Sequence, residues 1–265
     1  MTTVVITGAS TGIGRALALA WADEPSKPTL VLSARGESAL AGVAREVEAR
    51  GARAIVVSGD VTDEAHRRAL VDRAASEGGS IDVLVNNAGR GFYAPALKVD
   101  LDELRRLFEL NVIAPLRLVQ LAAPHLERSR GTVVMMSSVA GIVAAPRYAA
   151  YAATKFALEA ISMSMRSELA EVGVRVVVIR PGPVDTPFRA NAARAEGVVG
   201  YDAPDPKSQS ADDVARITLR AALRGSPVVE TSRFVRVASA GARHAPWVLR
   251  RVLARMATKH ERPGS

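Results

Sequence analysis

Short runs of β-branched and aliphatic residues alternate along the chain with longer stretches in which apolar positions recur every three to four residues. The short runs predict strands at Val4–Thr7, Thr29–Ser33, Ala54–Ser58, Val83–Asn86, Thr132–Ser137 and Val174–Ile179. The longer stretches predict helices at Gly12–Trp21, Ser38–Arg50, Glu64–Glu77, Leu101–Leu126 and Tyr151–Val172. Strands that are apolar on both faces and alternate with helices indicate an α/β fold, a doubly wound parallel sheet with helices on both faces.

Two segments depart from this alternation. Residues 190–209 carry several Gly and Pro residues and predict an irregular insertion or lid, about 187–209 in all. A last strand is expected near Glu230–Ala238, followed by a basic amphipathic helix that contains Trp247 to Met256 and a frayed end at 260–265. We therefore expect one domain at residues 1–240 and a C-terminal helix and tail at 241–265. This helix could pack on its own domain or on a second copy, lie on an anionic membrane, or cover a substrate site.

The composition of the 265 residues narrows the possible functions. Cysteine is absent, which excludes disulfides and thiolate metal sites, and the four His residues form no ligand pair, so no metal site is expected. The chain begins in a predicted strand and has no apolar run of about 18 residues, so we expect neither a signal peptide nor a membrane span, and a cytoplasmic location. Basic residues exceed acidic ones by eight, but aromatic residues are only 4% and no nucleic-acid motif is present. We therefore expect no nucleic-acid partner.

A glycine-rich turn lies directly between the first predicted strand and the first helix. It comprises Thr7, Gly8, Ser10, Thr11, Gly12, Ile13 and Gly14. Glycines in this position allow a tight turn and let backbone amides approach a pyrophosphate at the positive end of the helix. The strand–turn–helix context favours dinucleotide binding over an ordinary turn.

Polar residues follow the next three strands. Arg35 follows the second strand, where an acidic residue would accept hydrogen bonds from the NAD ribose; an Arg can instead pair with the 2′-phosphate of NADP, or lie on the surface. Asp60-Val61 follows the third strand and could cap the next helix or contact an adenine amino group. Asn87-Ala88-Gly89, after the fourth strand, could tie strand ends together beside a cofactor or form a plain turn.

Tyr151 and Lys155 are four residues apart and so share one helix face. A Lys ammonium beside a phenol favours the phenolate, which predicts a lowered pKa for Tyr151 and a role in proton transfer. Ser138, at the end of the fifth strand, can reach the same cleft and hold a substrate oxygen. Asn111 is a poor helix former inside a predicted helix, which indicates a kink, a polar role or simple exposure.

These ordered motifs resemble those of the short-chain dehydrogenase/reductase family, in its compact single-domain form with a Rossmann-type sheet, from Thr3 to about Phe188. The resemblance implies that Asn111, Ser138, Tyr151 and Lys155 form a catalytic tetrad, with Tyr151 as acid/base and Asn111 holding a water near Lys155. It implies a cofactor site made by the glycine turn, Arg35, Asp60, Val61, Asn87, Ala88, Gly89, Tyr151, Lys155, Pro181, Gly182, Val184 and Thr186. Arg35 favours NADP(H), although Thr11 stands where many NADP-preferring members carry a basic residue, and NAD(H) is possible.

The resemblance also implies an oxidoreductase that interconverts a carbonyl and an alcohol. A predicted apolar substrate pocket comprises Phe92, Tyr93, Ile142, Tyr148, Pro183 and Phe188. It favours an apolar ketone or alcohol, and these side chains could equally belong to the core. A homodimer or homotetramer is expected, although the Asp-Gly-Gly ending of many tetrameric members is absent. The alternatives are an NAD-linked alcohol dehydrogenase and a cofactor-binding sensor or scaffold without turnover.

Overall fold

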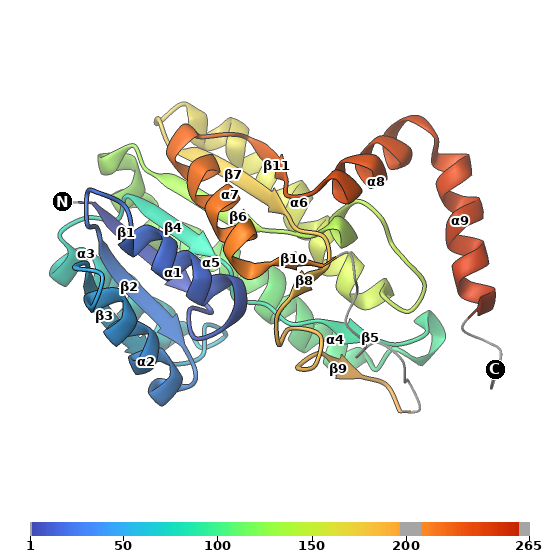
Figure 1. The fold of residues 1–265 in the computed structure, drawn as a ribbon, viewed down its shortest axis with the longest axis horizontal. Helices are drawn as coiled ribbons and strands as arrows, with labels where there is room; N and C mark the ends of the chain where they lie inside the picture. Colours follow the sequence, from blue (N-terminus) through green and yellow to red (C-terminus); the bar gives the residue numbers. More distant parts are fainter. Residues whose placement is uncertain (1, 197–207, 260–265) are drawn as a thin grey trace.

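A seven-stranded parallel sheet forms the centre of the computed structural model, which describes residues 2–196 and 208–259 (Figure 1). The strand order is β11-β7-β6-β4-β1-β2-β3. The strands are β1 Thr3–Thr7, β2 Thr29–Ala34, β3 Arg53–Ser58, β4 Val83–Asn86, β6 Thr132–Met136, β7 Arg175–Arg180 and β11 Val228–Glu230. The predicted doubly wound α/β fold is confirmed, and the six predicted strands agree with the observed ones to within one residue at each end.

Helices cover both faces of the sheet. One face packs against α1 (Gly12–Ala22), α2 (Glu37–Glu48) and α7 (Ala211–Arg224). The other packs against α3 (Glu64–Gly78), α5 (Ala114–Ser129) and α6 (Ala149–Ala170).

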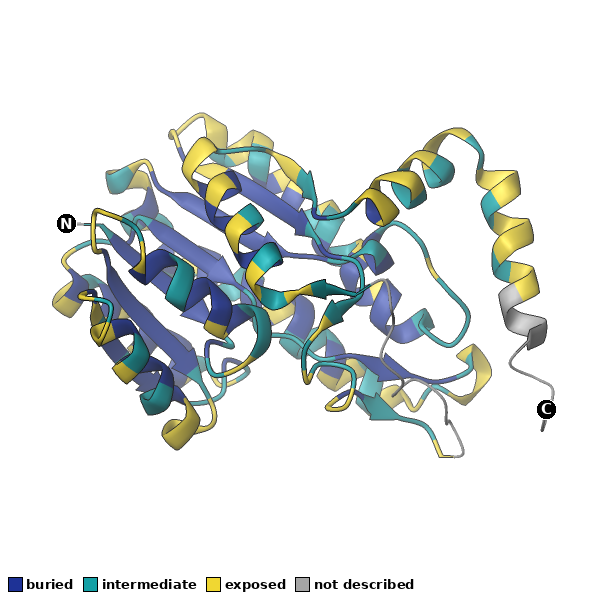
Figure 2. Ribbon diagram, viewed as in Figure 1, coloured by how far each residue is buried: buried dark blue, intermediate teal, exposed yellow. Residues whose placement is uncertain are grey.

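Successive side chains of each strand point to opposite faces of the sheet, as the pleat of a strand requires. In β1, Val4 and Ile6 join the cluster under α1 and α2, whereas Val5 joins the cluster under α3, α5 and α6. The central strands appear buried along their length in Figure 2. Burial on both faces explains why their sequences are continuous apolar runs rather than alternating ones.

Shorter elements surround the carboxyl edge of the sheet. β5 (Phe92–Tyr93) pairs with β9 (Ala193–Arg194), and β8 (Val184–Asp185) pairs with β10 (Gln209–Ser210). Two 3-10 turns are also present: η1 (Ala96–Lys98) follows β5, and η3 (Val139–Gly141) follows β6. Residues 187–196 and 208–209 of the predicted insertion contribute to these ribbons, whereas 197–207 lie outside the described residues.

The predicted helix at Leu101–Leu126 is interrupted. α4 (Leu101–Phe108) passes into a π-helical turn, η2 (Glu109–Ile113), which leads into α5. Asn111 lies in this turn and is completely buried, so of the three alternatives considered for it exposure is excluded. By length and composition the combined run Leu101–Ser129 is apolar enough to cross a membrane, but residues of α5 such as Leu118, Val119 and Leu126 are buried against the sheet.

The C-terminal prediction needs correction. The strand expected at Glu230–Ala238 is instead the end of β11 and the start of α8 (Arg233–His244), because the Ser232 hydroxyl accepts a hydrogen bond from the Val235 amide and caps a helix there. α9 (Pro246–Lys259) follows and contains the predicted amphipathic helix. The expected boundary at residue 240 falls inside α8, so we define the C-terminal arm as residues 233–259; the predicted frayed end, 260–265, lies outside the described residues.

The core of α1 gives a test of the packing. Leu17 is completely buried between α1 and the sheet, so Leu17→Ala should lower the free energy of unfolding by about 2–5 kcal/mol through lost burial and a cavity. Leu97→Ala is the matched control, because that side chain is fully exposed and should change stability by less than about 0.5 kcal/mol. Urea denaturation followed by circular dichroism measures both, and equal losses would contradict the assigned core.

Candidate active site

A cavity of about 1070 Å³ lies at the carboxyl edge of the sheet. The segment after each of six strands contributes to its lining, as expected for a ligand site in a doubly wound sheet. One residue from each of these segments is Gly12, Arg35, Asp60, Asn87, Ser138 and Pro181. The topology therefore gathers the motifs that are dispersed in the sequence.

The glycine turn has the backbone that a bound phosphate needs. Gly8 and Gly12 have φ values of 66° and 54°, in the left-handed region that favours glycine. A Cβ on Gly14 would lie 2.1 Å from the Gly8 carbonyl oxygen, so only glycine lets α1 start this close to the turn. The Thr11 side chain makes no cap hydrogen bond and the first turn of α1 has no acidic residue, which leaves the positive end of the helix available to an anion.

Thr7 and Asn87 join the ends of β1 and β4. The Thr7 hydroxyl accepts hydrogen bonds from the backbone amides of Asn87 and Ala88, each at 3.1 Å. The Asn87 side-chain amide donates to the carbonyls of Thr7 and Gly8 at 2.9 and 3.2 Å. Thr7 and Gly14 were predicted to bind cofactor but do not line the cavity, so both shape the turn from behind while Ser10, Thr11, Gly12 and Ile13 face the space.

Arg35 and Asp60 lie on the cavity wall beyond β2 and β3. The exposed Arg35 side chain makes no hydrogen bond or ion pair with any residue in the described part of the chain, which leaves its guanidinium free for a ligand. Asp60 accepts hydrogen bonds from the Thr62 amide and hydroxyl, at 2.9 and 2.8 Å. Burial opposes ionisation, but these two bonds together with the nearby Arg35 charge hold the Asp60 pKa below its usual value.

The alternative role considered for Asp60, capping the next helix, belongs to Asp63. The Asp63 carboxylate accepts from the Ala65 amide at 3.0 Å at the start of α3. Asp60 therefore stays in the cavity wall beside Val61.

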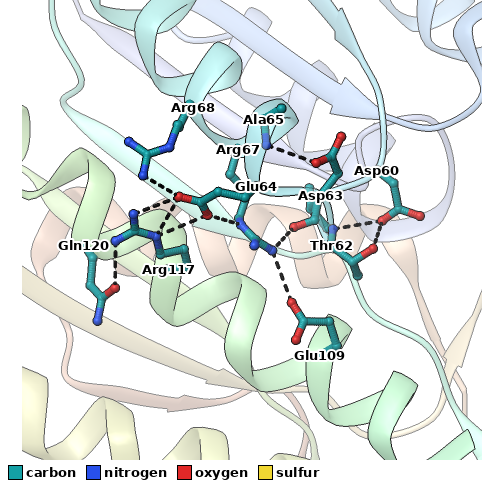
Figure 3. Close-up of polar contacts among 11 residues, drawn as sticks. Asp60, Thr62, Asp63, Glu64, Ala65, Arg67, Arg68, Glu109, Arg117 and Gln120 are labelled. Atoms are coloured by element: carbon teal, nitrogen blue, oxygen red, sulfur yellow. Dashed lines mark hydrogen bonds and ion pairs between the residues drawn. The ribbon is translucent and has the colours of Figure 1, made fainter. Parts of the chain in front are cut away.

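A charged network ties this wall to the π-helical turn (Figure 3). The buried Arg67 guanidinium donates to the Val61 carbonyl at 2.8 Å and to the Glu109 carboxylate at 3.3 Å. Glu64 accepts from Arg117 of α5 at 2.8 Å and from Arg67 at 3.1 Å. These bonds, Arg117 first, lower the Glu64 pKa to about 2 against the opposing effect of burial. The network therefore fixes α3 against the segment that carries Asn111.

Tyr151, Lys155 and Ser138 meet at the floor of the cavity. Tyr151 and Lys155 are only 7% and 5% exposed, and both line the cavity from α6. The Lys155 Nζ donates to the Met136 carbonyl at 2.8 Å and lies 5.8 Å from the centre of the Tyr151 ring. The Ser138 hydroxyl accepts from the Ala140 amide at 3.1 Å, and the side chain lies close enough to Tyr151 to lower the Tyr151 pKa.

Burial favours the neutral form of both residues of this pair, so the Tyr151 pKa is shifted in the direction opposite to the one that the sequence predicted. Burial raises the Tyr151 pKa, against the lowering effect of the nearby Ser138 side chain. Burial also lowers the Lys155 pKa to about 8, opposed by the Glu159 carboxylate. Within the chain alone, desolvation therefore outweighs the expected stabilisation of a Tyr151 phenolate by Lys155.

The Asn111 side chain joins the segment after β4 to α6. Its side-chain oxygen accepts from the Arg90 amide at 3.0 Å, and its side-chain nitrogen donates to the Arg90 carbonyl at 2.9 Å and to the Thr154 hydroxyl at 3.1 Å. A Cβ on Gly89 would lie 3.1 Å from the Asn111 oxygen and 3.7 Å from the Lys155 Nζ. Asn111 is fully buried and does not line the cavity, so it holds the Gly89–Arg90 segment against α6.

Four of the six predicted substrate-pocket residues line the cavity: Tyr93, Tyr148, Pro183 and Phe188. The rings of Tyr93 and Tyr148 meet edge to face at 4.8 Å, and those of Tyr151 and Phe188 lie 5.7 Å apart. Phe92 instead belongs to the core, because adjacent residues of a strand point to opposite sides, and Ile142 does not line the cavity.

The loop after β7 forms the remaining wall. Pro181, Gly182, Val184 and Thr186 all line the cavity as predicted. The Pro181 carbonyl accepts from the Val139 amide at 2.8 Å, which joins this loop to the segment that follows Ser138.

Sequence reasoning missed two parts of the lining. The first is Ser137, whose buried hydroxyl has no hydrogen-bond partner in the described part of the chain and borders the cavity. The second is the side of α8 that carries Phe234; Val248 and Leu249 of α9 also line the cavity, in agreement with one of the three placements expected for that helix. The amphipathic pattern of α9 was visible, but a helix pattern does not show what its apolar face will meet. Among the described residues, no group of three His, Asp or Glu could hold a metal ion.

The lowered pKa of Lys155 predicts a specific pH dependence of stability. Between about pH 8 and pH 10 the unfolded chain keeps the Lys155 proton while the folded chain has lost it, so folding gains stability as pH rises. The free energy of unfolding of the wild type minus that of Lys155→Met should therefore rise by up to about 1.4 kcal/mol per pH unit in this window. Urea denaturation at several pH values measures the difference, and a flat difference would contradict the lowered pKa.

Comparison with known proteins places this site in a family. The model for short chain dehydrogenases matches residues 2–197. An uncharacterized oxidoreductase of Methylorubrum extorquens is 37% identical over 217 residues, which cover 80% of this chain and 87% of the relative. The L-fucose dehydrogenase of Oryctolagus cuniculus is 36% identical over 206 residues, which cover 77% of this chain and 68% of the relative.

A solved structure extends the similarity to the whole chain. The short-chain dehydrogenase of Sphingobium yanoikuyae, in complex with NADPH, has a TM-score of 0.77 at 26% identity and covers 100% of this chain and 98% of its own. The chain belongs to the short-chain dehydrogenase family of oxidoreductases.

Proposed function

We propose that this protein is an NADP(H)-dependent oxidoreductase that interconverts a carbonyl and an alcohol, with Tyr151 as the general acid and base. The observation that carries the proposal is the convergence of three side chains on the cavity: Tyr151, Ser138 close enough to lower the Tyr151 pKa, and the buried Lys155. Two hydroxyl groups that converge on one point of a cavity can both bond to a single substrate oxygen.

The cavity residues fit a dinucleotide. The glycine turn and the open start of α1 suit the pyrophosphate, and the unpartnered Ser137 hydroxyl offers a further hydrogen bond near Ser138. Asp60 and Val61 would border the adenine, Asn87 and Gly89 the adenosine ribose, and Lys155 the nicotinamide ribose. When bound, the nicotinamide supplies or accepts a hydride at its C4. The NADPH complex of the Sphingobium yanoikuyae relative supports the choice of cofactor.

The chain's own groups provide the proton and the orientation. In reduction, Tyr151 donates its proton to the carbonyl oxygen as negative charge develops there, and Ser138 donates a second hydrogen bond that holds this oxygen. A phenol carries its proton at neutral pH, so Tyr151 can act as the proton donor in the reductive direction. Tyr93, Tyr148 and Phe188 give the substrate carbon an apolar and aromatic wall, which favours an apolar substrate.

Removal of the Tyr151 hydroxyl tests the proposed acid. Tyr151→Phe should lower kcat by about 10²–10⁴-fold in NADPH-dependent reduction of a panel of ketones, aldehydes and quinones, with NADPH affinity retained. Ser138→Ala should lower kcat by about 10²–10³-fold, as loss of one donor to a developing oxyanion does. Ser164→Ala is the matched control, because this hydroxyl lies on the exposed side of α6, where it donates to the Glu168 carboxylate.

The same variants separate an enzyme from a sensor or scaffold. Tyr151→Phe in a sensor would leave the NADPH-dependent output intact. Full reductase activity in Tyr151→Phe would contradict the assignment of the acid.

Arg35 tests the cofactor preference. Arg35→Ser should weaken NADPH binding by about 10–100-fold, the value of a charge-assisted hydrogen bond, and leave NADH binding nearly unchanged. Arg45→Ser, at an exposed position of α2 outside the cavity lining, is the control and should change neither affinity. Fluorescence titration gives both dissociation constants. Equal affinity of the wild type for NADPH and NADH would instead favour the NAD-linked alternative.

A further inference from the structure

The inner face of the C-terminal arm is part of the cavity that contains Tyr151. Nine residues of the arm line it, eight in α8 and α9 and Ala245 between them, and all are apolar or glycine. The largest are Phe234, Val237, Val248, Leu249, Val252 and Leu253. In α9 these positions follow the three- and four-residue spacing of one helix face, which runs for about 12 Å from Ala245 to Leu253.

The opposite face of the arm is cationic. Arg250 and Arg251 lie on this face, exposed and absent from the cavity lining, and Arg255 is exposed at its border; the Arg251 guanidinium lies 5.5 Å from the centre of the Trp247 ring. The arm contains seven Lys and Arg residues and no Asp or Glu, so it carries seven of the eight net positive charges of the chain. The arm is therefore polarised, with its apolar face toward the cavity and its charge toward solvent.

The apolar face is only partly covered. The Val248 and Val252 side chains are 41% and 47% exposed although they line the cavity. Figure 2 shows the arm projecting from the body of the protein. A helix face of this kind leaves apolar surface in contact with water unless a ligand covers it. A helix built to lie on a membrane would turn this face outward, whereas here the outward face carries the arginines.

The arm is attached next to the reacting end of the cavity. Val235 of α8 is completely buried, and a Cβ on Gly182 would lie 3.1 Å from its side chain. Gly182 belongs to the loop after β7, which lines the cavity together with Lys155, the residue proposed to border the nicotinamide ribose. Phe188, whose ring is 5.7 Å from that of Tyr151, and Phe234 of the arm line the same cavity. The apolar lining thus continues from the catalytic floor to α9.

We propose that the substrate carries a long unbranched apolar chain, such as a fatty acyl or alkyl chain, which extends from the carbonyl at Tyr151 along the inner face of the arm. This inference rests on the proposed function and adds the substrate class. Leu249 and Leu253 then determine chain-length preference, because they are the larger and less exposed of the four α9 side chains in the lining.

A chain-length series tests this inference. We would measure kcat/KM with NADPH for butanal, octanal and dodecanal, and for the corresponding methyl ketones, below their solubility limits. Each methylene removed from water can raise kcat/KM by up to about fourfold, so a partly open wall should favour dodecanal over butanal by at least about tenfold. In Leu249→Asn and Leu253→Asn the ratio of dodecanal to butanal should fall about fivefold or more, since a polar group then faces the chain.

Arg250→Asn is the matched control, since it introduces the same side chain on the outer face of the same helix and should keep the wild-type ratio. Activity that is independent of chain length in the wild type would overturn the inference while leaving the proposed function intact. Absence of reduction of every compound in the series and the wider panel would count against the proposed function itself. If the Leu249→Asn and Leu253→Asn variants lose binding to phosphatidylglycerol vesicles but keep the dodecanal-to-butanal ratio of the wild type, the inference about the substrate chain is overturned in favour of a membrane contact.

Discussion

The burial of the Lys155 ammonium is the constraint on which the rest of the site depends. A cation in a desolvated position is unstable without polar partners, and the Met136 carbonyl at the end of β6 provides the hydrogen bond. That bond joins α6 to the centre of the sheet and so fixes where Tyr151 lies. The opposite shifts of the two pKa values, with Tyr151 raised and Lys155 lowered to about 8, follow from the same desolvation.

Close backbone approaches keep this buried pair in place. Gly89 has no side chain, which lets the segment after β4 pass between Asn111 and Lys155, and the Asn111 side chain then holds Arg90 and Thr154 together. The π-helical turn brings Asn111 inward, and the Arg67 bond to Glu109 ties that turn to α3. Polar residues from different parts of the chain, Asn111, Arg67 and Glu109, thus together hold the segments that surround Tyr151 and Lys155.

The sequence predicted the strands, the helices on both faces of the sheet and the strand-end motifs that line the cavity, because doubly buried strands and glycine turns have strong local signatures. The sequence did not predict features that depend on contacts between residues far apart in the chain. Phe92 and Tyr93 are adjacent and similar, yet only Tyr93 lines the cavity, since the direction of a two-residue strand depends on its pairing with β9. The direction of the Tyr151 pKa shift was also wrong for the chain alone, because burial cannot be measured from spacing. The helix at Arg233–His244 was missed because Ser232 acts as a cap only in the folded chain.

Transfer of deuterium tests the central claim most directly. The enzyme would be incubated with an apolar aldehyde and with NADPH deuterated at C4, each of the two stereoisomers being used separately. The account predicts that one stereoisomer, and not the other, gives an alcohol with a single deuterium on the former carbonyl carbon, detected by mass spectrometry. Alcohol formed without deuterium from both stereoisomers would contradict hydride transfer in this cavity.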